Sequence, residues 1–273
     1  MLYCDKEKKG AAARKARGMS KDQVKSKFLV LVCALLIGVS MTGCTTNPHV
    51  AEGEVYDPLE DINRGTFAVN DALDQAIVEP VAKGYRAVTP KFVRNSVVNF
   101  LRNLRSPINV ANQILQGDIE GAAADISRFA MNTTIGVGGL FDVAAETGLE
   151  YEREDFGQTL GVWGIDHGPY LVLPFFGPSS FRDATGLLVD AVADPVRIYL
   201  FNTDQEEWHY ARIAATGLAT REELIDVLDD LRENSLDYYA AMRSAYIQRR
   251  DAMVRDDDPD AFVGPVIPDY DDE

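Results

Sequence analysis

The sequence predicts an all-helical protein. Apolar residues recur at helical spacing in several segments, residues that cap helices precede these segments, and no segment alternates convincingly as a strand does. Beyond residue 44 no apolar stretch approaches the roughly 20 residues that a membrane-spanning helix needs. We therefore expect amphipathic helices, none of which spans a membrane.

The N-terminus has the pattern of an export signal. Residues 28–39 form an unbroken apolar run, which is shorter than the about 20 residues of a membrane span. Basic residues precede this run: Lys21, Lys25 and Lys27. Small residues then lead to Gly43, and Cys44 follows directly, which is typical of a lipoprotein signal peptide. The alternative is an ordinary signal with a chance cysteine. Translation starts at Met1 or at Met19, and Met19 gives a signal of normal length.

We expect residues 1–43 to be removed and Cys44 to become the diacylglyceryl-modified first residue. Several acyl chains hold a protein firmly on a membrane, at about 0.8 kcal/mol per buried CH₂. Residues 44–54 then form a lipidated tether. Thr45 stands where an Asp would retain an enteric lipoprotein in the inner membrane, so it favours the outer membrane.

The rest of the chain is acidic and has no cysteine. Residues 45–273 contain 18 basic and 40 acidic residues, which opposes nucleic acids and anionic surfaces as partners. Residues 80–117 are the exception, because they contain six basic residues and no acidic one. Residues 251–273 are the opposite, and we expect them to form an acidic, disordered tail. The region 55–250 between tether and tail is expected to form one helical domain.

The basic region contains the clearest amphipathic pattern. Thr89 and Pro90 have the residue types of a helix start, and the helix is expected to end near Pro107. One edge of it is apolar, within about 60° on a helical wheel: Val93, Val97, Phe100 and Leu104. Another edge is basic: Lys91, Arg94, Arg102 and Arg105. An earlier segment, residues 67–77, has a weaker pattern of the same kind.

Further helices are predicted from their caps. Asp118 can cap a helix that runs to residues 132–134 and a glycine cluster, and Ser180 with Asp183 resembles a capping box. Thr220 with Glu223 resembles another, and a last helix is expected over about residues 236–253. The region 155–178 between them is rich in glycine, proline and aromatic residues, so it cannot form a long helix.

No catalytic constellation stands out, and we expect no catalytic residue, metal site or cofactor. The three histidines are far apart in sequence: His49, His167 and His209. The sequence GPSSF around Ser179 is not a nucleophile elbow. The glycine cluster at residues 136–139 follows a helix, so a hinge or helix cap is favoured over a dinucleotide-binding loop. Asp155, Asp166 and Asp183 offer only a chance acid–base pair in so acidic a chain.

Motifs spread over about residues 55–250 resemble the MlaA/VacJ family of outer-membrane lipoproteins. The strongest is Asp155-Phe156-Gly157-Gln158-Thr159-Leu160-Gly161, with Trp163-Gly164 after it. The others, in chain order, are Asp57-Pro58-Leu59-Glu60, Asn63-Arg64, Asn99-Phe100, Asn103-Leu104, Pro107, Leu115-Gln116-Gly117, Arg128-Phe129, Asn132-Thr133-Thr134, Gly136-x-Gly138-Gly139-Leu140-x-Asp142-Val143-Ala144, Gly168-Pro169-Tyr170, Leu173-Pro174, Gly177-Pro178 and Arg182-Asp183.

The resemblance implies a fold and a function. The fold is a ring of amphipathic helices lying in the membrane plane around a central amphipathic channel, associated with a trimeric porin. The function is removal of mislocalised phospholipids from the outer leaflet of the outer membrane of a Gram-negative bacterium, with delivery to a soluble periplasmic carrier. The glycine cluster would be a hairpin that gates lipid entry, through Gly136, Gly138, Gly139 and Phe141.

Two other classes of function are alternatives to lipid transport. One is a structural envelope lipoprotein that scaffolds porins without lipid transfer, and the other is a lipid-acting enzyme, which the missing nucleophile argues against. The basic edge leads to a hypothesis of its own, that Arg94, Arg102 or Arg105 contacts the phosphate of a transiting lipid or of surrounding headgroups. The alternative is that these arginines pair with the chain's own carboxylates.

Overall fold

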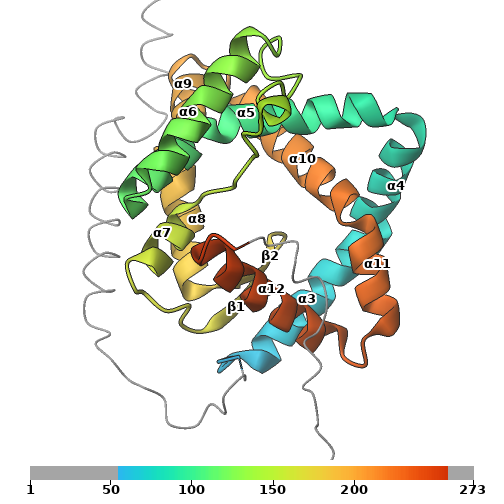
Figure 1. The fold of residues 1–273 in the computed structure, drawn as a ribbon. Coiled ribbons are helices and arrows are strands. Elements are labelled where there is room, and N and C mark those ends of the chain that lie inside the picture. Colours follow the sequence, from blue (N-terminus) through green and yellow to red (C-terminus); the bar gives the residue numbers. More distant parts are fainter. Residues whose placement is uncertain (1–54, 258–273) are drawn as a thin grey trace, which may run out of the picture. The chain divides into compact units, whose positions relative to one another are not determined.

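The computed structural model describes residues 55–257, and nearly all of their regular structure is helical (Figure 1). The prediction of an all-helical protein is confirmed apart from one short hairpin. Within this range no helix is long and apolar enough to cross a membrane. The expected signal peptide, the lipidated Cys44, the tether and the tail beyond residue 257 lie outside the described residues.

The first helical segment is continuous but irregular. It consists of α3 (Glu60–Leu73), a π-helical turn (Asp74–Val78) and α4 (Glu79–Val88). Pro80, which has no N–H to donate, lies two residues after the wide turn. The extra residue in that turn shifts the helical register, which explains why the apolar pattern of residues 67–77 is weak.

Helix α5 (Lys91–Gln116) is longer than the sequence predicts. It continues through Pro107, so the expected end there is wrong. An interior proline costs a helix about 3 kcal/mol, but buried residues on both sides of Pro107 hold this helix in place. Asn109 donates to the carbonyl of Glu152 (2.8 Å), and Asn112 donates to Asp190 (3.2 Å). The helix also begins one residue later than expected, because Pro90 rather than Thr89 is the N-cap.

Two of the expected caps are present and one is not. Asp118 caps α6 (Ile119–Thr134) by accepting from Gly121 (3.0 Å), and Ser180 caps α8 (Phe181–Ala193) by accepting from Asp183 (3.1 Å). The box at Thr220 and Glu223 is wrong, since both residues lie inside α10 (Glu206–Glu223). Leu224 stands between α10 and α11 (Ile225–Asn234), without a side-chain cap.

The remaining elements complete the chain. They are a short 3-10 helix (Ala145–Thr147), α7 (Phe156–Val162), α9 (Pro195–Asn202) and α12 (Tyr238–Val254). The last helix agrees with the prediction for residues 236–253, and Asp237 caps it. The glycine- and proline-rich region forms no long helix, as predicted.

That same region contains a hairpin that sequence analysis missed. Strand β1 (Tyr170–Leu173) pairs antiparallel with β2 (Gly177–Ser180). The free edge of β1 is covered by α3, where Asn63 donates to the Tyr170 carbonyl and accepts from the Val172 amide, both at 2.9 Å. Asn70, two helical turns later, pairs in the same way with Leu173 and Phe175. Side-chain amides thus take the place of a third strand.

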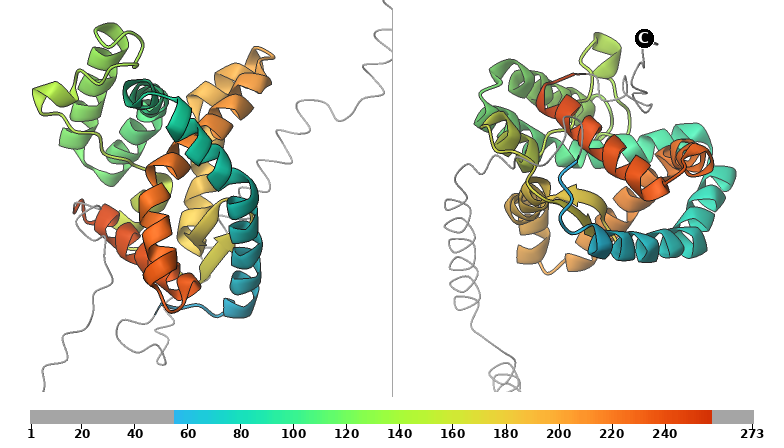
Figure 2. Two further views of the ribbon diagram at one scale, coloured as in Figure 1. Left: turned by 90° about the vertical axis from the view of Figure 1, so that its right-hand side faces the viewer. Right: turned by 90° about the horizontal axis from the view of Figure 1, so that it is seen from below.

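The helices follow one another around a ring (Figure 1). Ion pairs between early and late helices hold it together, since Arg86 of α4 binds Glu222 of α10 (2.7 Å) and Arg221 of α10 binds Asp74 (2.8 Å). Both views of Figure 2 place α6 and the loop after it away from α3. A small apolar core of Tyr170, Val172 and Tyr239 lies where β1, α3 and α12 meet.

Burial in this structure is inverted relative to a typical soluble domain. Of the described residues, 22 buried ones are polar or charged and only ten are apolar, while 35 large apolar residues are exposed. Helix α6 is an example, because Ile119 and Ile126 of its apolar stripe are exposed whereas Asp125 and Arg128 are buried. The amphipathic helices therefore direct their polar faces inward.

Candidate functional site

The glycine cluster lies in a loop, residues 135–144, that ends α6 and that we call the glycine loop. Its first amides bond back to the end of the helix, with Gly138 donating to Thr133 (3.0 Å) and Gly139 donating to Asn132 (2.8 Å). Val137, Gly138 and Gly139 all have positive φ, at 54°, 71° and 92°. The loop is therefore a helix C-cap, which was the favoured interpretation of these glycines.

Two glycines of the loop are required by close packing. A Cβ at Gly136 would lie 2.2 Å from the Phe141 carbonyl oxygen, so only glycine lets the loop fold back on itself. A Cβ at Gly139 would lie 2.6 Å from the Cβ of Asn103 in α5. By contrast, nothing lies within 4 Å of a Cβ at Gly138. The loop is thus fixed against α5 at one glycine and open at another.

The outer side of the glycine loop is apolar. Ile135 and Val137 are 65% and 62% exposed, and Leu140 and Phe141 are exposed as well. The backbone of the same loop lies against the buried side chain of Asn103 at Gly139. The loop therefore combines an apolar outer side with a polar base.

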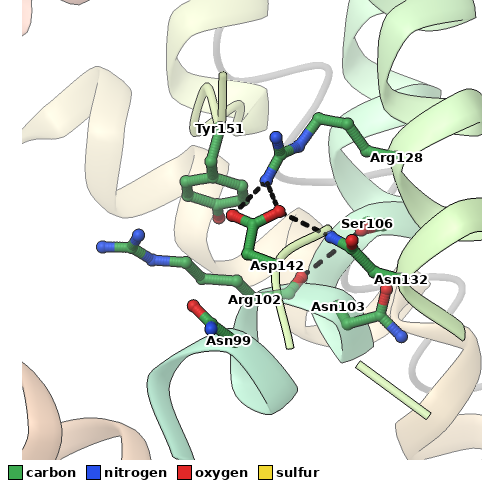
Figure 3. Close-up of a pocket in the computed structure, with 8 residues that line it drawn as sticks. All are labelled: Asn99, Arg102, Asn103, Ser106, Arg128, Asn132, Asp142 and Tyr151. Carbon is green, nitrogen blue, oxygen red and sulfur yellow. Dashed lines mark hydrogen bonds and ion pairs between the residues drawn. The ribbon is translucent and has the colours of Figure 1, made fainter. Parts of the chain in front are cut away.

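The base of the loop borders a small polar pocket between α5, α6 and the segment that follows the loop (Figure 3). Its volume is about 10 Å³, which is about the space of a single water-sized group. Eight residues line what we call the polar pocket: Asn99, Arg102, Asn103, Ser106, Arg128, Asn132, Asp142 and Tyr151.

One wall of the polar pocket is a buried ion pair. Arg128 of α6 donates to both carboxylate oxygens of Asp142, at 2.8 and 3.1 Å, and also donates to the Leu149 carbonyl. Asn132 donates to Asp142 (2.9 Å) and accepts from the Ala144 amide (3.0 Å). Burial alone would raise the pKa of Asp142, but the hydrogen bonds from Arg128 and Asn132 lower it below its ordinary value.

The other wall is Arg102 of α5, whose guanidinium points away from the Arg128–Asp142 pair (Figure 3). It lies over the ring of Tyr151, 4.9 Å from the centroid, and its carboxylate partner Glu223 is 3.4 Å away. Its side chain is 41% exposed. Arg102 is therefore oriented by an aromatic ring while its charge remains accessible.

The other two arginines of the predicted basic edge lie elsewhere. Arg94 is 17% exposed, forms an ion pair with Glu222 (3.2 Å) and donates to the carbonyls of Arg86 and Thr89. Arg105 donates to the Glu154 carbonyl (2.9 Å) and lies 3.6 Å from Asp190. The basic edge thus spreads along α5, and only Arg102 meets the glycine loop at the polar pocket.

Residues weighed as catalytic candidates have structural partners. Arg250 of α12 binds both Asp155 (2.7 Å) and Asp183 (2.9 Å), which connects α12 with α7 and α8. Hydrogen bonds from Arg250 hold the pKa of Asp155 well below its ordinary range despite burial, which alone would raise it. Among residues 55–257 no group of three His, Cys, Asp or Glu side chains is arranged to hold a metal ion.

Sequence reasoning assigned no role to Arg128, Asp142 or Tyr151. The available signal was the spacing of Asp125, Arg128 and Asn132, which places three polar side chains on one face of α6. A polar helix face is ordinarily expected to be exposed, so the pattern predicts a solvent-facing surface, whereas this face is buried. Tyr151 lies in irregular structure, where spacing gives no guide to its contacts.

The sequence model of the MlaA lipoprotein family matches residues 55–253. An uncharacterized protein of Rickettsia prowazekii is 38% identical over 202 residues, which is 74% of this chain and 79% of the relative. The intermembrane phospholipid transport system lipoprotein MlaA of Escherichia coli is 35% identical over 223 residues, 80% of this chain and 86% of its own length. The corresponding lipoprotein of Haemophilus influenzae is 31% identical over 238 residues, 84% and 92% of the two chains.

One solved structure agrees with this relationship. It comes from work on the structural basis for maintenance of bacterial outer membrane lipid asymmetry, and it superposes with a TM-score of 0.65 at 37% identity. The match covers 72% of this chain and 98% of the other. The family match covers well over half of the sequence, and the relatives share more than 30% identity over most of its length. The chain belongs to the MlaA lipoprotein family.

Proposed function

We propose that this protein removes mislocalised phospholipids from the outer leaflet of the outer membrane and passes them through a central channel to a soluble periplasmic carrier. The proposal draws on family membership, since relatives of similar length are named as phospholipid transport lipoproteins. The observation in the molecule itself that carries it is the inverted burial of the helices.

The many exposed apolar residues favour contact with lipid over contact with water. Removing apolar surface from water is worth about 25 cal/mol per Å², and soluble monomers rarely expose apolar patches of more than a few hundred Å². Thirty-five exposed large apolar residues on one helical unit are readily accommodated by bilayer hydrocarbon. We infer that the helices lie in the membrane plane and that their outer faces contact lipid or a trimeric porin.

The polar interior supports a route for a charged headgroup. A phospholipid in transit needs polar lining for its phosphate and apolar lining for its chains. Arg102 supplies an accessible guanidinium, and the exposed Ile135, Val137 and Phe141 of the glycine loop supply apolar surface. We propose that the glycine loop gates lipid entry, with Gly136, Gly138 and Gly139 permitting its fold, and that Arg102 contacts the lipid phosphate.

The same proposal assigns a signal peptide, a lipid anchor and a tether to the residues that precede the described structure. Residues 1–43 are a lipoprotein signal peptide, Cys44 carries the lipid anchor, and residues 44–54 connect it to the helical unit. The anchor delivers and orients the protein in the outer membrane of a Gram-negative bacterium. Replacing Cys44 with Ala should therefore mislocalise the protein and abolish transport, while the detergent-solubilised protein still binds phospholipid.

Gene deletion tests the proposal and separates it from its alternatives. Phospholipid should accumulate in the outer leaflet of the deletion strain, and the wild-type gene should reverse this. Transfer between outer-membrane vesicles and the purified carrier should require the protein. Unaltered lipid asymmetry would instead support a porin scaffold, and lysophospholipid formed only when the protein is present would support an enzyme. No covalent bond of the lipid changes in the transfer that we propose.

A further inference from the structure

The polar pocket contains an unsatisfied hydrogen-bond acceptor. Asn103 of α5 is only 7% exposed, and its Oδ1 atom has no hydrogen-bond partner among the described residues. Its Nδ2 atom donates to the Thr133 hydroxyl of α6 at 3.0 Å. A buried acceptor without a donor is unfavourable, and a group that donates to it is bound more tightly in consequence.

The surroundings of Asn103 restrict which group can reach that atom. The pocket has room for about one water-sized group, and Gly139 of the glycine loop lies directly against the Asn103 side chain. The atoms that the loop meets there are Cβ, Cγ and Nδ2, so the glycine loop closes the pocket beside the amide. The other charges at the pocket are balanced, because Arg128 is paired with Asp142 and Arg102 lies near Glu223.

Two donors suitable for phosphate lie on the same wall as Asn103. Arg102 follows Asn99 by three residues on α5, so both side chains line the pocket from one helix face. Asn99 donates only to the Leu140 carbonyl, at a long 3.5 Å, and Arg102 is held by the Tyr151 ring. Asn99 and Asn103 are four residues apart on α5 and therefore share a helix face, so a phosphodiester bound at Asn99 would have its headgroup beside Asn103.

We propose that the polar pocket is a headgroup subsite and that Asn103 determines its specificity. This inference rests on the proposed function. Arg102 and Asn99 bind the phosphate that all phospholipids share. Asn103 Oδ1 accepts a hydrogen bond from a headgroup that ends in N–H or O–H, as ethanolamine and glycerol headgroups do. A choline headgroup has three methyl groups on nitrogen and no donor, so it is too large for the pocket and leaves the acceptor unsatisfied.

The test measures binding of lipids that differ only in their headgroup. The full-length protein, purified in detergent, is titrated with phosphatidylethanolamine, phosphatidylglycerol and phosphatidylcholine of identical acyl chains, and bound lipid is quantified by native mass spectrometry. We expect the first two lipids to bind about five- to thirty-fold more tightly than phosphatidylcholine, the effect of satisfying one buried polar group. A difference between the first two identifies ammonium or hydroxyl as the better donor.

Three variants separate the roles of the pocket residues. Asn103→Leu keeps the branched shape of the side chain but removes both of its polar atoms, so it should abolish the preference while phosphatidylcholine binding stays unchanged. Thr133→Val removes the partner of Nδ2 and leaves Oδ1 in place, so it should retain the preference. Arg102→Gln should weaken the binding of all three lipids by the same factor. Thermal unfolding and circular dichroism establish that each variant is folded.

The outcomes distinguish this inference from the function on which it rests. Binding of all three lipids with equal affinity would overturn the headgroup subsite and leave lipid transport intact. Failure to bind any of them would contradict the proposed function itself. Loss of the preference in Thr133→Val as well as in Asn103→Leu would show that packing of the loop, rather than the acceptor, discriminates between headgroups.

Discussion

Arg128 and Asp142 form an ion pair, with one guanidinium nitrogen donating to both carboxylate oxygens, that connects α6 to the far end of the glycine loop. The pair is largely buried, with Arg128 almost fully covered. Replacement of one partner leaves the other charge buried without compensation, which typically costs about 3–5 kcal/mol. The glycine loop therefore has a rigid polar anchor at its base.

Asp142→Asn should lower the free energy of unfolding by about 3 kcal/mol, measured by chemical denaturation of the purified protein. Lys83→Met is the matched control, because Lys83 pairs with Glu79 (2.7 Å) and Asp229 (3.0 Å) at the surface. Exposed pairs contribute about 0–1 kcal/mol, so the control should unfold almost as the wild type does. Equal losses in the two variants would contradict a special role for the buried pair.

The two adjacent glycines of the loop should differ in their tolerance of alanine. Both have positive φ, which costs a residue with a Cβ about 1–2 kcal/mol. Gly138→Ala should show this loss alone, because its Cβ meets nothing. Gly139→Ala should lose more stability and more transfer activity, since its Cβ would lie 2.6 Å from that of Asn103 and α5 would have to shift. Similar losses at both positions would mean that the loop does not rest on α5.

The asparagines that cover the edge of β1 should contribute unequally to stability. Asn63→Leu leaves the buried Tyr170 carbonyl and Val172 amide without partners, and should cost about 2–3 kcal/mol. Asn70→Leu should cost less than about 1 kcal/mol, because water can reach the Phe175 amide. Denaturation curves of the two variants measure this difference, and a reversed order would argue against the edge-covering role of Asn63.

Sequence reasoning predicted the helices well where local chemistry decides them. Asp118 and Ser180 cap helices because their side chains bond to amides three residues later, an interaction that depends on neighbouring residues alone. The ring fold and the family were inferred from motifs and agree with the comparisons. The hairpin was missed because its strands are four residues long and its edge partner, Asn63, lies more than 100 residues earlier.

The candidate site was only partly predictable for a related reason. The glycines predict the loop, but Pro107 predicts a helix end, because the distant groups that hold α5 in place are not visible in the sequence. The three arginines of the basic edge share a helix face. Their separate roles depend on which acidic residues the later helices bring to each of them: Glu222 to Arg94, Glu223 to Arg102 and Asp190 to Arg105.

His167 should make stability depend on pH near neutrality. It bonds to Asp251 of α12 (2.7 Å) and lies 3.8 Å from Asp183 of α8. Burial lowers the pKa of His167, but the carboxylates of Asp183 and Asp251 outweigh this and raise it above 6.5, even with the positive Arg182 nearby. The stabilisation is therefore complete below pH 6.5 and is lost as the pH rises through the raised pKa.

The melting temperature of the wild type should accordingly fall as the pH rises above 6.5. His167→Gln should reduce this slope and leave the part due to Glu154, whose pKa burial raises to about 8. His209→Gln is the control with the opposite sign. Burial lowers the pKa of His209, so its neutral form is favoured and it destabilises the fold as the pH falls. Melting curves at constant ionic strength measure both effects, and an unchanged slope in His167→Gln would exclude the His167 contact as its source.

Arg102 and Arg94 should give different results when their charge is reversed, although both belong to the predicted basic edge. Arg102→Glu should reduce lipid transfer to the carrier while costing less than about 1 kcal/mol of stability, because its pair with Glu223 is exposed and long. Arg94→Glu should destabilise the protein by about 3–5 kcal/mol, because it places a second carboxylate beside the buried Glu222. Denaturation and transfer assays on both variants separate a loss of folding from a loss of lipid contact.

The double variant Arg102→Glu with Glu223→Arg decides what Arg102 does. If Arg102 serves only to pair with Glu223, exchanging the two charges restores the pair and should restore transfer. If its guanidinium contacts lipid phosphate beside Tyr151, the exchanged arginine stands on α10 instead of at the polar pocket, and transfer should stay low. We expect the second result. The ring of Tyr151 orients Arg102 at the pocket, whereas the Glu223 carboxylate is exposed and lies 3.4 Å from the Arg102 guanidinium.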